Sequence, residues 1–225
     1  MSTRGFIGYK HNGVIKGYYN HHDSYPEGLG STLIKEVYCK YTWPEIKDFF
    51  LHRLNLLNEE KWEEYKRVSA DNGGVKKPKL DTTDLKTTCI TVKDESEFLK
   101  DGLFCEYSYV FDLDSKRKKL MCFKGFGEKP SKGYEHLYYE SNQKDRLYNN
   151  YMGCIYGELH PIIAYGKMIV AFKKDDEKEG VEPVWKTVRR MLKAPQEDLP
   201  LYLNHPYEIV CEIASNLLKG AKNGK

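Results

Sequence analysis

The chain has no long apolar run. No stretch approaches the roughly 20 residues of a transmembrane helix, and the first residues lack the apolar segment of a signal peptide. A strong excess of one charge is also missing: 36 basic and 33 acidic residues leave a net charge of +3. This balance argues against general nucleic-acid binding, although it permits a local basic patch. The lack of a long apolar run predicts no membrane contact.

Cysteine pairs with the C-x-x-C spacing of zinc or redox sites are absent as well. The six cysteines are widely spaced, at positions 39, 89, 105, 122, 154 and 211. Several of them stand inside apolar runs. Buried cysteine in such a run behaves as a small apolar residue, which favours reduced thiols over disulfides. Reduced thiols predict a cytoplasmic location. The cysteines predict neither a metal centre nor a disulfide framework.

The familiar sequence signatures of catalysis are missing too. The chain has no Walker loop, no Gly-x-Gly-x-x-Gly after a strand and no Gly-x-Ser-x-Gly elbow. The sequence therefore identifies no cofactor. It also leaves open whether the protein is an enzyme.

What the chain does contain is enough apolar material for a core. Of 225 residues, 40% are hydrophobic and 13% aromatic, which suits one domain over residues 1–219 with a disordered tail at 220–225. Tyrosine occurs 18 times. Because a phenol buries its ring but needs a hydrogen-bond partner, this abundance favours grooves or interfaces, unless it reflects a compositional bias.

Two hairpins are predicted. Residues 5–10 and 14–19 read as strands joined at Asn12-Gly13, a dipeptide that accepts the positive φ angles of a tight turn. Residues 106–112 and 119–124 form the second pair around a turn at 114–116. Further strands are expected at 87–92 and 167–172. Together these predict a mixed, mainly antiparallel sheet of an α+β protein.

Helices are predicted between and after the hairpins. Apolar residues recur at helical spacing after Ser31, and Thr42 with Glu45 forms a capping box for the next helix. The segment 31–68 is expected to pack on one face of the sheet, with a helical insertion there as an option. The full set of expected helices is 31–40, 42–57, 59–68, 95–99, 145–152, 184–193 and 206–219.

Polar chemistry is densest between Tyr18 and Gly30. His21 and Asp23 stand two apart, so on extended chain they share a face and resemble a general base with its orienting carboxylate. We interpret these two as the candidate catalytic pair; a structural network is the competing interpretation. The candidate ligand-binding residues are Arg4, Tyr19, His22, Ser24 and Tyr25.

Other candidates are weaker. Arg4 could pair with Asp23 or hold a phosphate or carboxylate with its fork of donors. Glu158-x-His160 and the pair at 136 and 140 have metal-type spacing but no third ligand, so no metal site is predicted. Ser2 or Thr3 could serve as an N-terminal nucleophile after removal of Met1.

The first thirty residues and the second hairpin also carry a resemblance. They resemble a group of uncharacterised phage and bacterial proteins that begin with a Thr-Arg motif and carry a Tyr-x-His-x-Asp-Gly/Ser-Tyr-Pro stretch. The matching residues are Thr3-Arg4, Tyr19, His21, Asp23 to Pro26, Gly28 to Gly30, Tyr109 to Asp114 and Lys124-Gly125. The resemblance covers less than a quarter of the chain. It implies a phage or mobile-element origin and no mechanism.

Two functions are compatible with these observations. The first is an accessory protein that binds a host protein or a small ligand, such as a nucleotide signal, including a counter-defence role. The second is a hydrolase that uses His21 and Asp23 or an N-terminal nucleophile. The sequence leaves the oligomeric state open.

Overall fold

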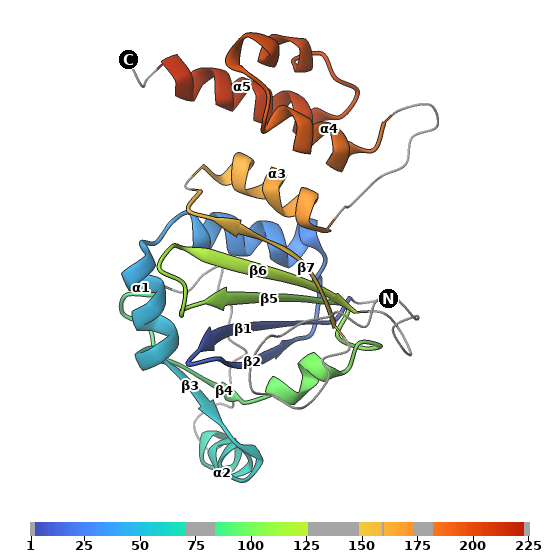
Figure 1. The fold of residues 1–225 in the computed structure, drawn as a ribbon. Helices are drawn as coiled ribbons and strands as arrows, with labels where there is room; N and C mark the ends of the chain where they lie inside the picture. Colours follow the sequence, from blue (N-terminus) through green and yellow to red (C-terminus); the bar gives the residue numbers. More distant parts are fainter. Residues whose placement is uncertain (1–2, 71–83, 126–148, 159, 173–181, 223–225) are drawn as a thin grey trace.

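The computed structural model describes residues 3–70, 84–125, 149–158, 160–172 and 182–222. Its centre is a sheet with the strand order β2-β1-β5-β6-β7 (Figure 1). The strands are β1 (Gly5–His11), β2 (Val14–Asn20), β5 (Tyr107–Asp112), β6 (Lys119–Gly125) and β7 (Asn149–Tyr156). All neighbours are antiparallel except β1 and β5. With helices packed against it, the sheet confirms the predicted α+β class.

The first hairpin turns where the sequence predicted. Asn12 and Gly13 have φ angles of 51° and 77°, the left-handed values that a two-residue turn of this hand requires. The parallel pairing of β1 with β5 then places Gly5 opposite Tyr107. Both predicted hairpins therefore belong to one sheet, as expected.

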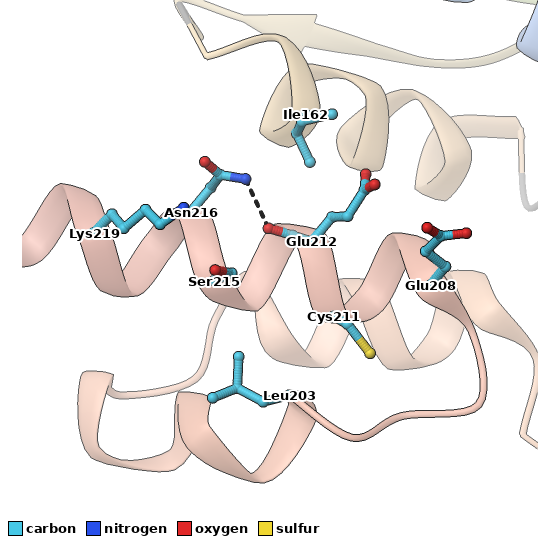
Figure 2. A pocket seen from close by; sticks show the side chains of 8 residues that line it. All are labelled: Ile162, Leu203, Glu208, Cys211, Glu212, Ser215, Asn216 and Lys219. Atoms are coloured by element: carbon cyan, nitrogen blue, oxygen red, sulfur yellow. Dashed lines mark hydrogen bonds between the residues drawn. The ribbon is translucent and has the colours of Figure 1, made fainter.

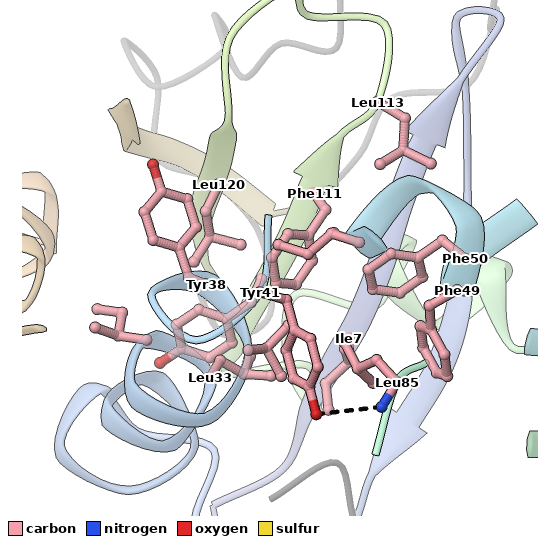
Figure 3. Packing of buried hydrophobic residues seen from close by; sticks show 14 of the residues in the cluster. Ile7, Leu33, Tyr38, Tyr41, Phe49, Phe50, Leu85, Phe111, Leu113 and Leu120 are labelled. Atoms are coloured by element: carbon pink, nitrogen blue, oxygen red, sulfur yellow. Dashed lines mark hydrogen bonds between the residues drawn. The ribbon is translucent and has the colours of Figure 1, made fainter. Parts of the chain in front are cut away.

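One face of the sheet is covered by the chain that follows β2. This chain forms the helical segments η1 (Pro26–Gly30), η2 (Leu33–Tyr38), α1 (Trp43–Asp48) and η3 (Phe49–Arg53). Helix begins earlier than the predicted residue 31, because Pro26 suits a first helical turn. The Thr42 amide donates to the Glu45 carboxylate at 2.7 Å, in line with the predicted cap. Large side chains from these segments and the sheet form the main core (Figure 3).

The region after η3 differs from the prediction. Residues Leu54–Leu57 form strand β3, which pairs in parallel with β4 (Ile90–Lys93), so the helix predicted over 42–57 ends at Arg53. Leu54 is buried and Asn55 exposed, an alternation that overrides the helical spacing of the leucines. Helix α2 (Glu59–Ala70) is present but buries no side chain and projects from the body (Figure 1). The prediction that the whole segment 31–68 packs on one face of the sheet was therefore wrong.

The opposite face of the sheet has a smaller core. Phe6, Val110 and Phe123 pack there against Leu99 of η5 (Ser96–Lys100), the short helix predicted at 95–99. The Phe6 ring lies over two facing glycines: a Cβ on Gly8 or Gly17 would come within 2.5 Å of it. These glycines leave the room that the aromatic ring fills.

Helix α3 (Pro161–Phe172) and strand β7 each correct a prediction. Residues 167–172 are helical and not a strand, and residues 149–152, predicted to be helical, lie in β7; the first part of that predicted helix, 145–148, lies outside the described residues. α3 lies between the sheet and the C-terminal helices (Figure 1). Met168 faces the main core and Ile169 a second core. A helix covered on two sides is apolar all round and loses its periodic signal.

The second core joins α3 to α4 (Val184–Met191), η6 (Gln196–Tyr202) and α5 (Glu208–Lys222). Both C-terminal helices were predicted, but α5 continues through Lys222, so residues 220–222 are helical where a tail was expected. All six cysteines are free thiols. Within the described ranges, no helix combines the length and apolar character needed to cross a bilayer.

Candidate functional site

The loop that follows β2 is anchored at Ser24. This residue is fully buried; its backbone amide donates to the Thr3 carbonyl at 3.2 Å, and its hydroxyl accepts from the side-chain Nδ2 of Asn20 at 2.8 Å. The Tyr109 hydroxyl donates to the Ser24 carbonyl at 3.0 Å. Ser24, predicted to bind ligand, therefore ties the loop to the sheet and is closed to solvent.

The predicted catalytic pair is not assembled. Asp23 has a φ of 51°, so the alternation of an extended strand, on which a shared face with His21 depends, breaks at this residue. Its side chain is exposed and makes no hydrogen bond or ion pair with any residue that the structure describes. The Asp23 carbonyl instead accepts from the Leu29 amide at 2.7 Å. Neither His21 nor Arg4 is paired with this carboxylate.

The structure does bring Arg4, Tyr19 and His21 to one end of the sheet. The rings of Tyr19 and His21 meet edge to face with centroids 4.2 Å apart. Tyr19 also meets Phe98 of η5 edge to face at 4.7 Å. Burial raises the pKa of the Tyr19 phenol, and the nearby Arg4 charge opposes that rise. Tyr19 is thus in ring contact with both His21 and Phe98 and lies within the electrostatic influence of Arg4.

Two residues that the sequence did not single out complete this surface. Leu103 and Phe104 are 47% and 46% exposed. The amides of both donate to the Asp101 carboxylate, which fixes the turn that presents them. The only sequence signal was two large apolar residues beside Gly102, between the helix predicted at 95–99 and the strand predicted at 106–112. We call the set of Arg4, Tyr19, His21, Phe98, Leu103 and Phe104 the Arg4–Phe104 surface.

The Arg4 guanidinium has an unusual environment for a surface arginine. It lies over the Phe104 ring, 5.0 Å from the centroid, an arrangement favoured by the cation–π attraction. Nearby carboxylates are turned to backbone amides: Glu106 accepts from the Arg4 amide at 3.2 Å and Glu95 from the Tyr19 amide at 3.1 Å. Within the described residues, no acceptor takes a hydrogen bond from the guanidinium. Among these residues its donors are therefore uncommitted, and they lie beside the exposed Phe104 ring.

The remaining candidates have other places. His22 is exposed, and Tyr25 is half-buried with its ring beside Gly28. Glu158 accepts from the His160 amide at 2.9 Å and from the Lys167 ammonium at 3.1 Å, so it is a structural partner. Position 2 and the pair at 136 and 140 lie outside the described residues. Among the described residues, no group of three or more potential metal ligands comes together.

Chemically, the Arg4–Phe104 surface suits recognition better than proton transfer. It offers a planar cation that can bind a carboxylate in a bidentate manner, next to rings and an aliphatic side chain that can be covered by a partner. An oriented acid–base pair is not part of it. No protein-family model, curated protein or solved structure matches the chain.

Proposed function

We propose that the chain is a binding protein, an accessory protein of phage or mobile-element type, that recognises a host protein through the Arg4–Phe104 surface. The observation that carries this proposal is the Arg4 guanidinium held over the exposed Phe104 ring with its donors unused by the described residues. Arginine and aromatic residues are enriched where proteins bind one another. The partner segment would carry a carboxylate beside an apolar side chain.

A protein partner suits this surface better than a small ligand. Leu103 and Phe104 are neighbours on a turn, and each is about half exposed. Adjacent apolar side chains on a surface mark interaction sites. The N-terminal resemblance, which includes Arg4, Tyr19 and His21, agrees with a role outside core metabolism.

The proposal is tested by native mass spectrometry of the protein purified from its own host. Wild type should carry a partner protein at a defined stoichiometry, and Arg4→Gln combined with Phe104→Ser should lose it. The matched control is Arg189→Gln combined with Leu201→Ser, since both are exposed residues of the C-terminal helices and Leu201 is 80% exposed. Retention of the partner by the first double variant, at an unchanged melting temperature, overturns the proposed surface.

A further inference from the structure

A groove runs along the outer face of α5. Its volume is about 580 Å³, within the range of ligand sites. Figure 2 shows Ile162 of α3 on one side of the helix and Leu203 on the other. Between these apolar walls lie Glu208 and Glu212 at one end and Asn216 and Lys219 at the other. The groove is thus lined by apolar sides and carries opposite charges at its two ends.

These charges have no ion-pair partner in the described part of the chain. Glu208, Glu212 and Lys219 are exposed, and none forms an ion pair with another described residue. The two glutamates stand one helical turn apart, where like charges repel each other and a cation between them would be attracted. The Asn216 side chain donates to the Glu212 carbonyl at 2.8 Å, so it is held at the edge of the groove.

The spacing of the charges sets the length of a complementary ligand. Lys219 stands seven positions after Glu212, which is roughly 10 Å along a helix axis. An extended peptide covers that span in about three residues. A chain with a basic side chain three positions before its terminal carboxylate would place one charge against each end of the groove.

We propose that this groove binds the C-terminal end of a partner polypeptide. The terminal carboxylate lies at Lys219, the basic side chain lies at Glu212 with Glu208 one turn beyond it, and apolar side chains pack on Ile162 and Leu203. The groove is on a different part of the molecule from the Arg4–Phe104 surface. The inference therefore stands independently of the proposed function.

The test uses a fluorescein-labelled hexapeptide, Gly-Leu-Lys-Leu-Ala-Leu, with a free terminal carboxylate, and measures fluorescence anisotropy with the full chain. Two modified peptides isolate the two charges: one ends in an amide, and one has norleucine in place of lysine. Lys219→Gln should weaken binding of the free acid about threefold, the scale of an exposed ion pair, without changing binding of the amide. Glu212→Gln should weaken the lysine peptide and leave the norleucine peptide unchanged.

The control is Glu64→Gln on α2, which also removes one of two exposed glutamates a turn apart, Glu60 and Glu64, but in a helix that buries no side chain. It should leave the affinity unchanged. The proposal is overturned if wild type shows no saturable binding. It is also overturned if each groove variant weakens the modified peptides as much as the unmodified one, because the charges would then serve only the helix.

Discussion

Lys118, the residue before β6, and Tyr38, the last residue of η2, exchange hydrogen bonds. The Lys118 ammonium donates to the Tyr38 carbonyl at 2.9 Å, and the Tyr38 hydroxyl donates to the Lys118 carbonyl at 3.1 Å. The same ammonium also donates to the carbonyl of Tyr41. Lys118 is only 8% exposed, and its burial lowers the pKa of the ammonium. One buried cation therefore satisfies the carbonyls where η2 ends and fixes that end to the sheet.

Replacement of Lys118 by methionine should be strongly destabilising. The side chain keeps its length, but the carbonyls of Tyr38 and Tyr41 lose their donor in a buried place. Each unsatisfied group costs about 1–3 kcal/mol of unfolding free energy. Urea denaturation of Lys118→Met measures this loss, with the exposed Lys116→Met as its control. Equal midpoints for the two variants would contradict the role assigned to Lys118.

The two hairpin turns are joined by another charged contact, which predicts a pH effect. The Asp114 carboxylate accepts from the amides of Asn12 at 2.8 Å and Gly13 at 2.9 Å. Burial raises the pKa of this carboxyl. The two hydrogen bonds and the charges of Lys10 and His11 together lower it by more, so the pKa lies below its ordinary value. The carboxylate therefore stabilises the fold above the unfolded pKa of about 3.9, and that stability is lost as pH falls through the folded pKa.

Asp114→Ala should consequently be less stable than wild type at pH 7, by about 1–2 kcal/mol. The gap in unfolding free energy should shrink below pH 4 as the wild-type carboxyl is protonated. Chemical denaturation of both proteins from pH 7 to pH 2.5 checks this, with the exposed Glu197→Gln as a reference. A gap that stays constant over that range would show that the charge of Asp114 does not contribute.

The sequence was most informative where a few neighbouring residues decide the structure. Asn12-Gly13 defines its turn by backbone preference alone, and Thr42 with Glu45 marks a helix start in the same local way. Helix α3 is buried on two sides, so its apolar residues do not show helical periodicity. Such a continuous apolar pattern fits a strand as well as a buried helix. Tertiary pairing decided β3, whose leucines have helical spacing but lie opposite β4.

The candidate site was harder to predict for a similar reason. Asp23 adopts a left-handed backbone conformation, which the neighbouring residues do not predict. The expected pairing with His21 depended on an extended conformation that the loop lacks. Phe104 lies a hundred residues from Arg4 in the chain and meets it only because β1 and β5 are parallel neighbours. Local sequence patterns carry no information on such a contact.

Close packing of α3 on α5 predicts a coupled pair of substitutions. A Cβ on Gly166 would lie 2.4 Å from the Ile213 Cδ1 atom. Gly166→Ala should therefore destabilise the protein by about 1–2 kcal/mol despite the better helix propensity of alanine. In an Ile213→Val background, which lacks that methyl, the same change should be neutral or stabilising. Thermal melts of the four proteins form a double-mutant cycle.

Gly220 supplies the matched control for that cycle. It also lies in a helix, but nothing stands within 4 Å of an added Cβ. Gly220→Ala should raise stability by up to about 1 kcal/mol, the propensity difference alone. Additive effects of the Gly166 and Ile213 changes would mean that the two helices do not pack as closely as described.

Two buried tyrosines provide the last prediction, because only one of their hydroxyls forms a hydrogen bond with a described residue. The Tyr109 hydroxyl donates to the Ser24 carbonyl, whereas the Tyr18 hydroxyl has no hydrogen-bond partner among the described residues. Removing an unsatisfied buried hydroxyl should be neutral or stabilising, so Tyr18→Phe should keep or raise the melting temperature. Tyr109→Phe should cost about 1–3 kcal/mol, because it leaves the Ser24 carbonyl unpaired. It should also loosen the loop that carries His21, His22 and Asp23, which faster amide hydrogen exchange at residues 21–24 would detect. If Tyr109→Phe leaves both stability and exchange unchanged, the hydrogen bond to Ser24 does not hold this loop on the sheet.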